Sequence, residues 1–356
     1  MNMKLKYMIL PLLLACACSA CSDDNDVTDQ KTDTAEVKDV IIDTDLGNCV
    51  DDALALQIAF KYQAENKCKI LGVMQDWKLE KAKLLADCFL RYYKADDVPL
   101  GLVEGEEPIF EMTPYFQLVD STYADGSPWL PRTATPISER PVAWKLYRKL
   151  LSQAKDHSVN IVCIGALTNL GLLLQSQPDE YSPLSGAELV AQKVRQLDVT
   201  GGCFSKVKLK DKDEYLEAEY NIALDVPLAK AVLEQWPTPL HLLPLEEGMK
   251  FPTMHNEILS DYAWDPTGLI YRIFSHYDEW AVGDVGSHWW DALTLMHTIE
   301  PEKFFSCTQQ GKLKISDQGV TTFEPTDQGN AHIICVDVLH NMTVNNFLRS
   351  VAKWKP

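Results

Sequence analysis

Apolar runs rich in β-branched residues alternate with segments of helical spacing along most of the chain. The runs at 40–43, 68–75 and 159–166 predict buried strands, because they lack the polar alternation of a half-exposed strand. Helical segments follow them at 50–65, 78–94 and 167–177, and the alternation returns at 195–202, 226–236 and 239–245. Strands joined by helices predict an α/β fold with a mostly parallel central sheet and helices on both faces.

Two later segments depart from this alternation. Residues 310–336 alternate polar and apolar positions around glycine turns, which predicts a late β-hairpin. Residues 106–140 are rich in Pro, Ser and Thr and predict a long loop, and loops of that length are often lids or binding loops. Ligands of parallel sheets bind at the carboxyl ends of the strands, so we expect a site at that edge.

The first 21 residues predict a secretory signal peptide of the lipoprotein type. Two lysines precede a short apolar run that ends in small residues and cysteines, which is too short for a membrane-spanning helix. "LLAC" at 13–16 fits a lipoprotein cleavage box, and Cys16, Cys18 and Cys21 are alternative lipidation sites. Cys21 leaves the more ordinary length of apolar segment, so we expect lipidation there; a plain cleaved signal peptide is the alternative.

Residues 22–37 are acidic, polar and free of aromatic residues, which predicts a disordered tether. An acidic run after the cysteine resembles the surface-export signal of Bacteroidetes lipoproteins. We therefore expect a cell-envelope protein, periplasmic or surface-exposed, whose only membrane contact is its lipid anchor. Residues 38–356 remain for a single catalytic domain.

Net charge bears on which ligands the protein can bind, and cysteine content bears on whether it forms disulfides. The formal net charge is −18, which argues against nucleic-acid backbones as ligands. The cysteines beyond the tether are odd in number, form no CxxC motif and mostly have apolar neighbours, so core thiols are favoured over disulfides. They are Cys49, Cys68, Cys88, Cys163, Cys203, Cys307 and Cys335.

Four aspartates, Asp43, Asp45, Asp51 and Asp52, stand within ten positions between the first strand and its helix. Two carboxylates about 4 Å apart repel by roughly 4 kcal/mol near a protein surface, whereas a helix N-terminus stabilises each charge by about 0.3–1 kcal/mol. A hard cation can offset that repulsion, and oxygen ligands suit Ca²⁺ or Mg²⁺. The alternative is that two aspartates cap the helix while the others face solvent.

"DTDLGNCVDDALAL", residues 43–56, resembles the N-terminal signature of the inosine–uridine-preferring nucleoside hydrolase family. Four further stretches fall in the family's order, and the match covers nearly the whole chain beyond the tether. They are 161–170 (IVCIGALTNL), 199–202 (VTGG), 218–229 (AEYNIALDVPLA) and 288–296 (HWWDALTLM). The resemblance implies a Rossmann-like α/β fold, one Ca²⁺ below a ribose pocket, and hydrolysis of ribonucleosides to free base and ribose.

The resemblance also implies roles for individual residues. Asp45 would act as general base on a calcium-bound water. The implied ligands of the ion are Asp45, Asp52, the backbone carbonyl of Ile164, and Asp291. The ribose hydroxyls would be held by Asp51, Glu219 and Asn221. Taken alone, residues 219–221 fit a polar turn before a helix, and Asp291 fits a first-turn helix aspartate.

Trp290 stands where many family members carry a histidine that protonates the leaving base. In the purine-preferring branch a tryptophan occupies this position and stacks on the base, so the resemblance favours purine nucleosides. Core packing by Trp290 or Trp289 is the alternative, and His288 is a second possible proton donor. Cys49 replaces an aspartate of the family's longer signature, outside the expected ligand set.

Two glycine–asparagine pairs common in the family are missing. After the second strand the chain reads "GVMQDWK", so Gln75 or Asp76 must serve, and residues 208–217 replace the second pair. These departures keep open a modified ribosyl substrate, or a nucleoside- or ribose-binding lipoprotein without turnover. A phosphatase with Asp43 as nucleophile leaves "VDDALAL" unexplained. The family usually forms dimers or tetramers, and no residue here decides between them.

Overall fold

A mixed sheet of ten strands runs through the part of the chain that the computed structural model describes. That part comprises residues 36–47, 49–105, 114–133, 135–208, 216, 218–253, 255–277, 288–337 and 341–356. The chain divides into residues 1–35 and a compact unit, Glu36–Pro356. The predicted signal peptide, the lipidation site Cys21 and all but the last two tether residues lie outside the described residues.

The parallel part of the sheet places β1 near its centre. The strand order is β3-β2-β1-β4-β5-β6-β10-β8-β9, with β7 paired to β10. Neighbours from β3 to β10 along this order are parallel, and β8, β9 and β7 are antiparallel to their partners. The strands are β1 (Lys38–Thr44), β2 (Cys68–Gln75), β3 (Leu100–Leu102), β4 (Val159–Cys163), β5 (Val194–Thr200), β6 (Leu240–Leu243), β7 (Phe305–Cys307), β8 (Gly311–Ile315), β9 (Thr321–Pro325) and β10 (Ala331–Val336).

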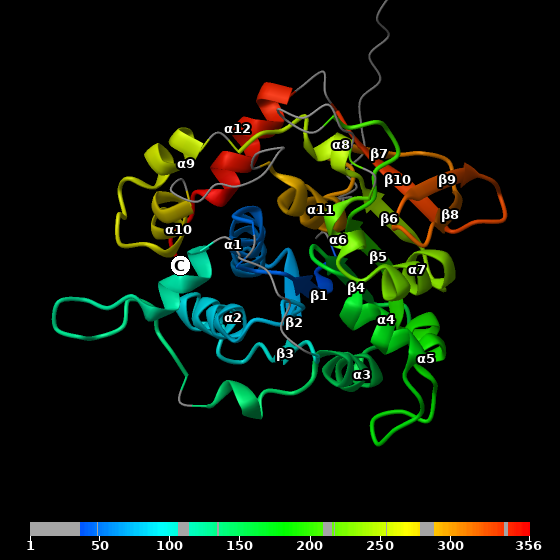
Figure 1. Cartoon of the computed structure of the whole chain (residues 1–356), viewed down its shortest axis with the longest axis horizontal. Coiled ribbons are helices and arrows are strands. Elements are labelled where there is room, and N and C mark those ends of the chain that lie inside the picture. The colour runs from blue at the N-terminus through cyan, green and yellow to red at the C-terminus, as the bar shows by residue number, and fades with distance from the viewer. Residues whose placement is uncertain are drawn as a thin grey trace, which may run out of the picture. The chain divides into compact units, whose positions relative to one another are not determined.

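Helices cover both faces of this sheet (Figure 1). One apolar core lies under α1, α2, α10, α11 and α12, and a second lies under α3, α4, α5 and α7. The helices are α1 (Asp51–Ala64), α2 (Glu80–Tyr92), η1 (Pro114–Asp120), η2 (Ile137–Glu139), α3 (Ala143–Gln153), α4 (Thr168–Gln175), α5 (Gly186–Lys193), α6 (Tyr220–Ala223), α7 (Val226–Gln235), α8 (Leu245–Gly248), α9 (His255–Tyr262), α10 (Leu269–Tyr277), α11 (Trp290–Ile299) and α12 (Asn341–Ala352).

The predicted fold class is confirmed. The apolar strands of the first half are buried on both faces because helices pack on each side, which is why their sequences show no polar alternation. The late hairpin is also present, as β8 and β9, and β8 alternates buried and exposed positions as a one-sided strand should. The long loop at 106–140 carries two short 3₁₀ helices within its described residues.

The carboxyl ends of β1, β2, β4 and β5 form one edge of the sheet, and the segments that follow them carry most of the polar residues singled out above. None of the helices in the described residues is long and apolar enough to span a membrane.

Candidate active site

Three neighbouring strands deliver polar groups to the same edge of the sheet. Asp45 follows β1, Asp76 follows β2, and Gly165 lies two residues beyond β4. A Cβ atom at Gly165 would lie 2.4 Å from Asp76 Oδ2 and 2.6 Å from the backbone nitrogen of Asp45. Only glycine allows this close approach, so the chain segments beyond β1, β2 and β4 pack directly against one another.

Asp51 and Asp52 form the first turn of α1, and Asp291 lies in the first turn of α11. The two helices pack against each other, so residues far apart in sequence meet here. One carboxylate oxygen from each aspartate lies within 4.8 Å of the others, and all three residues are buried. No side chain caps α1, and Asp45 is only 2% exposed. The capping interpretation therefore does not describe this cluster.

The cluster has more acceptor oxygens than donors. The Thr44 hydroxyl donates to Asp52 Oδ1, but Asp52 Oδ2 and Asp51 Oδ1 are buried and accept no hydrogen bond. Within the described residues, Asp51, Asp52 and Asp291 form no ion pair with lysine or arginine. Three carboxylates without a cationic partner are a donor set that fits a hard divalent metal ion.

Burial and mutual repulsion change the proton affinity of these groups. Burial raises the pKa of Asp51 to about 7, and burial together with the charge of Asp45 raises the pKa of Asp52 well above its usual range. The pKa of Asp291 is likewise raised by burial and by the charges of Asp51, Asp52 and Asp45. In the absence of a cation the folded protein therefore holds protons here near neutral pH.

Asp43 and Asp76 form a second acidic pair, whose charges interact with that of Asp45. Asn169 Nδ2 donates to Asp43 Oδ1 and the Tyr147 hydroxyl donates to Asp43 Oδ2, both over 3.0 Å. Neither oxygen of Asp76 accepts a hydrogen bond from a donor group, and its carboxyl lies against that of Asp43. Burial raises the pKa of Asp43 to about 7. With both oxygens held and no exposed surface, Asp43 is unsuited to act as a nucleophile.

Gln75 and Asp76, the two candidates to replace the asparagine that is missing after β2, have different partners in the structure. Gln75 Nε2 donates to the carbonyls of Leu46 (2.8 Å) and Ala82 (3.1 Å), so this side chain holds the loop after β1. Asp76, in contrast, places its carboxyl against that of Asp43, where it also feels the charges of Asp45 and Asp52. The residues that replace the second pair, 208–217, are described only at positions 208 and 216.

Glu219 and Asn221 lie at the start of α6, beside the end of β5. Glu219 Oε1 accepts from the Asn221 backbone (2.9 Å), and Oε2 accepts from Gly202 (3.2 Å) and Ile222 (3.3 Å). The Asn221 side chain donates to Thr200 O over 3.0 Å. Burial raises the pKa of Glu219 to about 7, and the charge of Asp45 adds to the shift. Glu219 therefore caps α6, and this role orients its carboxylate so that its charge interacts with that of Asp45.

Trp290 is held firmly in place next to Asp291. Its indole Nε1 donates to Leu245 O over 2.9 Å, and a Cβ at Gly248 would lie 1.8 Å from Trp290 Cδ1. Its ring centroid is 4.5 Å from that of His288. Trp290 is 8% exposed, so it packs in the core and also borders the acidic cluster.

Ile164 is the remaining predicted ligand, and its backbone lies beside that of Asp43. Its backbone nitrogen donates to Asp43 O over 2.8 Å, directly before the close approach at Gly165. Sequence reasoning assigned no role to Thr44, Asn169 or Tyr147. Thr44 and Asn169 fall inside the family motifs at 43–56 and 161–170, so the sequence could have pointed to them. Tyr147 comes from α3 and carries no sequence signal.

The chain matches a known family model over most of its length. A family model described as inosine-uridine preferring nucleoside hydrolase matches residues 40–348. Among curated proteins, no sequence matches the chain.

Solved structures with similar folds cover most of the chain. A plant nucleoside hydrolase, the PpNRh1 enzyme, has a TM-score of 0.66 at 18% identity, over 90% of this chain and 100% of its own. An inosine-guanosine nucleoside hydrolase has a TM-score of 0.67 at 18% identity, with the same coverage of both chains. A purine-preferring ribonucleoside hydrolase from Gardnerella vaginalis has a TM-score of 0.65 at 15% identity, over 89% of this chain and 99% of its own. At these identities the likeness establishes the fold.

The raised pKa values predict a pH dependence of stability in the presence of a chelator. Folded-state values near 7 exceed the unfolded value of about 3.9, so their stabilising contribution is complete below pH 4 and is lost as the pH rises through 7. Between pH 5.5 and pH 8 the melting temperature in EDTA should fall by roughly 5–10 °C. Asp51→Asn should reduce the fall, and a melting temperature that rises over this interval would contradict the expectation.

Proposed function

Because the chain belongs to the inosine-uridine preferring nucleoside hydrolase family, we propose that it hydrolyses the N-glycosidic bond of ribonucleosides to free base and ribose. The observation that carries this proposal is the buried cluster of Asp51, Asp52 and Asp291 beside Asp45, with carboxylate oxygens that no donor satisfies. The cluster lies at the carboxyl edge of a parallel sheet, where ligands of such sheets bind.

We propose Ca²⁺ as the resident cation. Asp45, Asp52, Asp291 and the Ile164 carbonyl would hold it, and an all-oxygen set with several carboxylates suits this ion. When bound, the ion supplies positive charge that offsets the carboxylates and polarises the oxygens of water and sugar that reach it.

The protein's own residues would carry out the remaining chemistry. Asp45 would accept a proton from the attacking water, acting as general base. Asp51, Glu219 and Asn221 would hold the ribose hydroxyls and so fix the anomeric carbon relative to that water. Cleavage of an N-glycosidic bond builds oxocarbenium charge on the sugar, and a floor of carboxylates stabilises that charge.

We propose that purine nucleosides are favoured. The support is the tryptophan at position 290, whose indole is fixed by its bond to Leu245 O and which directly precedes the cluster residue Asp291. A fixed aromatic wall would bind the larger purine ring more strongly than a pyrimidine. The alternatives are a nucleoside- or ribose-binding protein without turnover and a hydrolase of a modified ribosyl substrate. The first assay below would distinguish them from the proposed activity.

We further propose a lipid anchor at Cys21, with residues 22–37 as a tether to the catalytic domain. The lysines, apolar run and cysteines of the first 21 residues support this. Several acyl chains would hold the protein stably on the cell envelope, which a single chain does only weakly.

Asp45→Asn should lower the rate of base release by at least about 10³-fold, because the variant has no general base at that position. The assay is release of free base from inosine, adenosine, guanosine, uridine and cytidine, with calcium and with a chelator. Asp317→Asn, an exposed aspartate in the turn between β8 and β9, is the matched control and should keep full activity. Full activity of Asp45→Asn would refute the mechanism, and tight nucleoside binding without any base release would favour the binding protein.

Trp290→Leu should lower kcat/KM for inosine about two- to thirteenfold relative to uridine, since a stacking contact is worth about 0.5–1.5 kcal/mol. Trp264→Leu, at an exposed tryptophan, should leave both substrates unchanged. An unchanged ratio of inosine to uridine in Trp290→Leu would assign Trp290 to core packing alone.

Cys21→Ala should abolish incorporation of labelled fatty acid into the full-length protein expressed in a Gram-negative host. Cys16→Ala and Cys18→Ala are the matched controls and should still be labelled. Labelling that persists in Cys21→Ala but disappears in one of the controls would move the anchor to that cysteine.

A further inference from the structure

A tyrosine from the segment beyond β3 reaches back to the turn between β1 and α1. Tyr115, on the 3₁₀ helix η1, is fully buried. Its hydroxyl accepts a hydrogen bond from the backbone nitrogen of Gly47 and donates one to Cys49 O over 2.8 Å. Gly47 and Cys49 lie between Asp45 and the aspartate pair that opens α1. The proposed nucleoside chemistry assigns no role to Tyr115.

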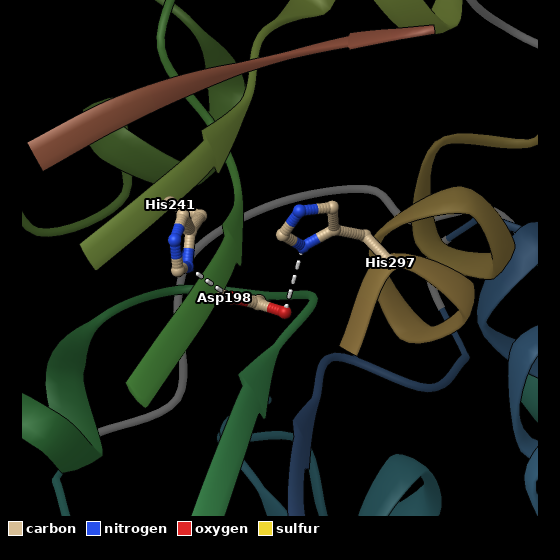
Figure 2. A group of neighbouring side chains, drawn as sticks. All are labelled: Asp198, His241 and His297. Carbon is tan, nitrogen blue, oxygen red and sulfur yellow. Dashed lines mark hydrogen bonds and ion pairs between the residues drawn. The ribbon is translucent and has the colours of Figure 1, made fainter. Parts of the chain in front are cut away.

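Helix α11, which carries Asp291 in its first turn, is fixed on the sheet by buried polar contacts of its own. Asp198 Oδ2, on β5, lies 3.0 Å from His297 Nδ1 and accepts a hydrogen bond from the Thr298 hydroxyl, both in the last turn of α11. Asp198 Oδ1 lies 2.8 Å from His241 Nδ1 on β6. Figure 2 shows the two rings converging on this carboxylate, one from the sheet and one from the helix.

The turn between β1 and α1 needs support from outside, because it has no regular secondary structure and no side chain caps α1. Gln75 Nε2 donates to Leu46 O and so holds the start of the turn. Gly47 has a φ of +114°, a conformation that favours glycine. A Cβ there would lie 3.3 Å from Phe116 Cβ, so the turn passes close to η1. Tyr115 is the contact from η1 that joins the two sides of the turn.

The Tyr115 hydroxyl satisfies one backbone donor and one backbone acceptor of the turn. Gly47 is buried, so conformations that break the bond leave its N–H without a partner and are disfavoured. Burial, together with the charges of Asp52 and Asp45, raises the pKa of Tyr115 well above its usual range. The hydroxyl therefore stays protonated and remains a donor to Cys49 O.

Helix η1 is itself packed into the domain, so it can act as a support. It contacts α2 and α10, and its buried side chains belong to the same apolar core as those of α1. Farther along the same segment, Arg272 on α10 donates from Nη2 to the Tyr123 hydroxyl over 3.0 Å. The Arg272 guanidinium also lies 4.2 Å from the centre of the Trp129 ring. These contacts fix the segment that carries Tyr115 against α10.

We propose that Tyr115 is a positioning residue for the metal site, whose hydroxyl holds the turn so that Asp45 stays beside Asp51 and Asp52. This inference rests on the proposed calcium site, of which Asp45 and Asp52 are ligands. Without the bridge the folded protein would also populate other conformations of the turn. An ion would then bind only the fraction of molecules that has its ligands together, and the apparent affinity would fall by that fraction.

Tyr115→Phe removes the hydroxyl and leaves the ring in the core, so it tests the bridge directly. Calorimetric titration of Ca²⁺ into the chelator-treated mature protein should give an affinity at least about fivefold weaker than that of the wild type. Tyr62→Phe is the matched control. Tyr62 is equally buried near the other end of α1, where its hydroxyl donates to Glu300, and this variant should bind calcium with wild-type affinity.

Thermal unfolding separates a positioning role from a general loss of stability. Both variants lose a buried hydrogen bond and should melt below the wild type in a chelator. The rise in melting temperature on adding a fixed concentration of calcium should be smaller only in Tyr115→Phe, because stabilisation by a ligand depends on its affinity. Base release by Tyr115→Phe should be reduced near the wild-type dissociation constant for calcium and restored at saturating calcium.

Equal calcium affinities of the wild type and Tyr115→Phe would overturn the positioning role and leave the proposed hydrolysis standing. An equal loss of affinity in Tyr62→Phe would also overturn it, because the effect would then follow overall stability. A wild type that binds calcium and releases no base would refute the hydrolysis, while a weaker affinity in Tyr115→Phe alone would still support the positioning role. A wild type that binds no calcium would overturn the positioning role together with the calcium site.

Discussion

Asp51, Asp52 and Asp291 bring three carboxylates within 4.8 Å of one another in a buried site. At an effective dielectric constant of about 20, each pair repels by roughly 3–4 kcal/mol, so three pairs cost about 10 kcal/mol. Typical domains are stable by about 5–15 kcal/mol in total, so this repulsion alone could unfold the protein. The arrangement persists only with compensating charge, which is either protons on the carboxyls or a cation between them. The contact between helices α1 and α11 is what brings these three carboxylates together.

Much of the fold and of the acidic site could be predicted from patterns that are local in the sequence. The strand–turn–helix of residues 40–65 and its aspartates follow from apolar runs and residue spacing within a few turns of chain. The acidic residues after β1 and at the start of α1 were therefore found from the sequence itself. Asp291, Glu219 and Asn221 came only from the family resemblance, because short polar turns and first-turn aspartates are common in any protein. In the structure Asp291 belongs to the buried acidic cluster, whereas Glu219 and Asn221 lie beside the end of β5, with the Asn221 side chain bonded to Thr200 O.

Contacts between distant segments could not be predicted in the same way. Whether Gln75 or Asp76 lies near the acidic residues depends on which face of the sheet each position at the end of β2 points to, and a shift of one residue in register reverses the answer. Tyr147 reaches Asp43 only because α3 packs on the sheet. Asp198, His241 and His297 are separated by more than forty residues each, so no spacing motif joins them. They meet because β5 and β6 pair in register and α11 lies over them.

Helix α11 carries Asp291 in its first turn and His297 in its last. It packs against α1, whose first-turn aspartates stand more than two hundred residues earlier in the chain. Asp51 and Asp52 meet Asp291 only while these two helices are docked, so an ion held by all of them would bind the folded domain and not the unfolded chain. A ligand of that kind stabilises the folded state by an amount that grows with the logarithm of its concentration. The calcium concentration around the protein would then set the stability of the domain as well as its activity.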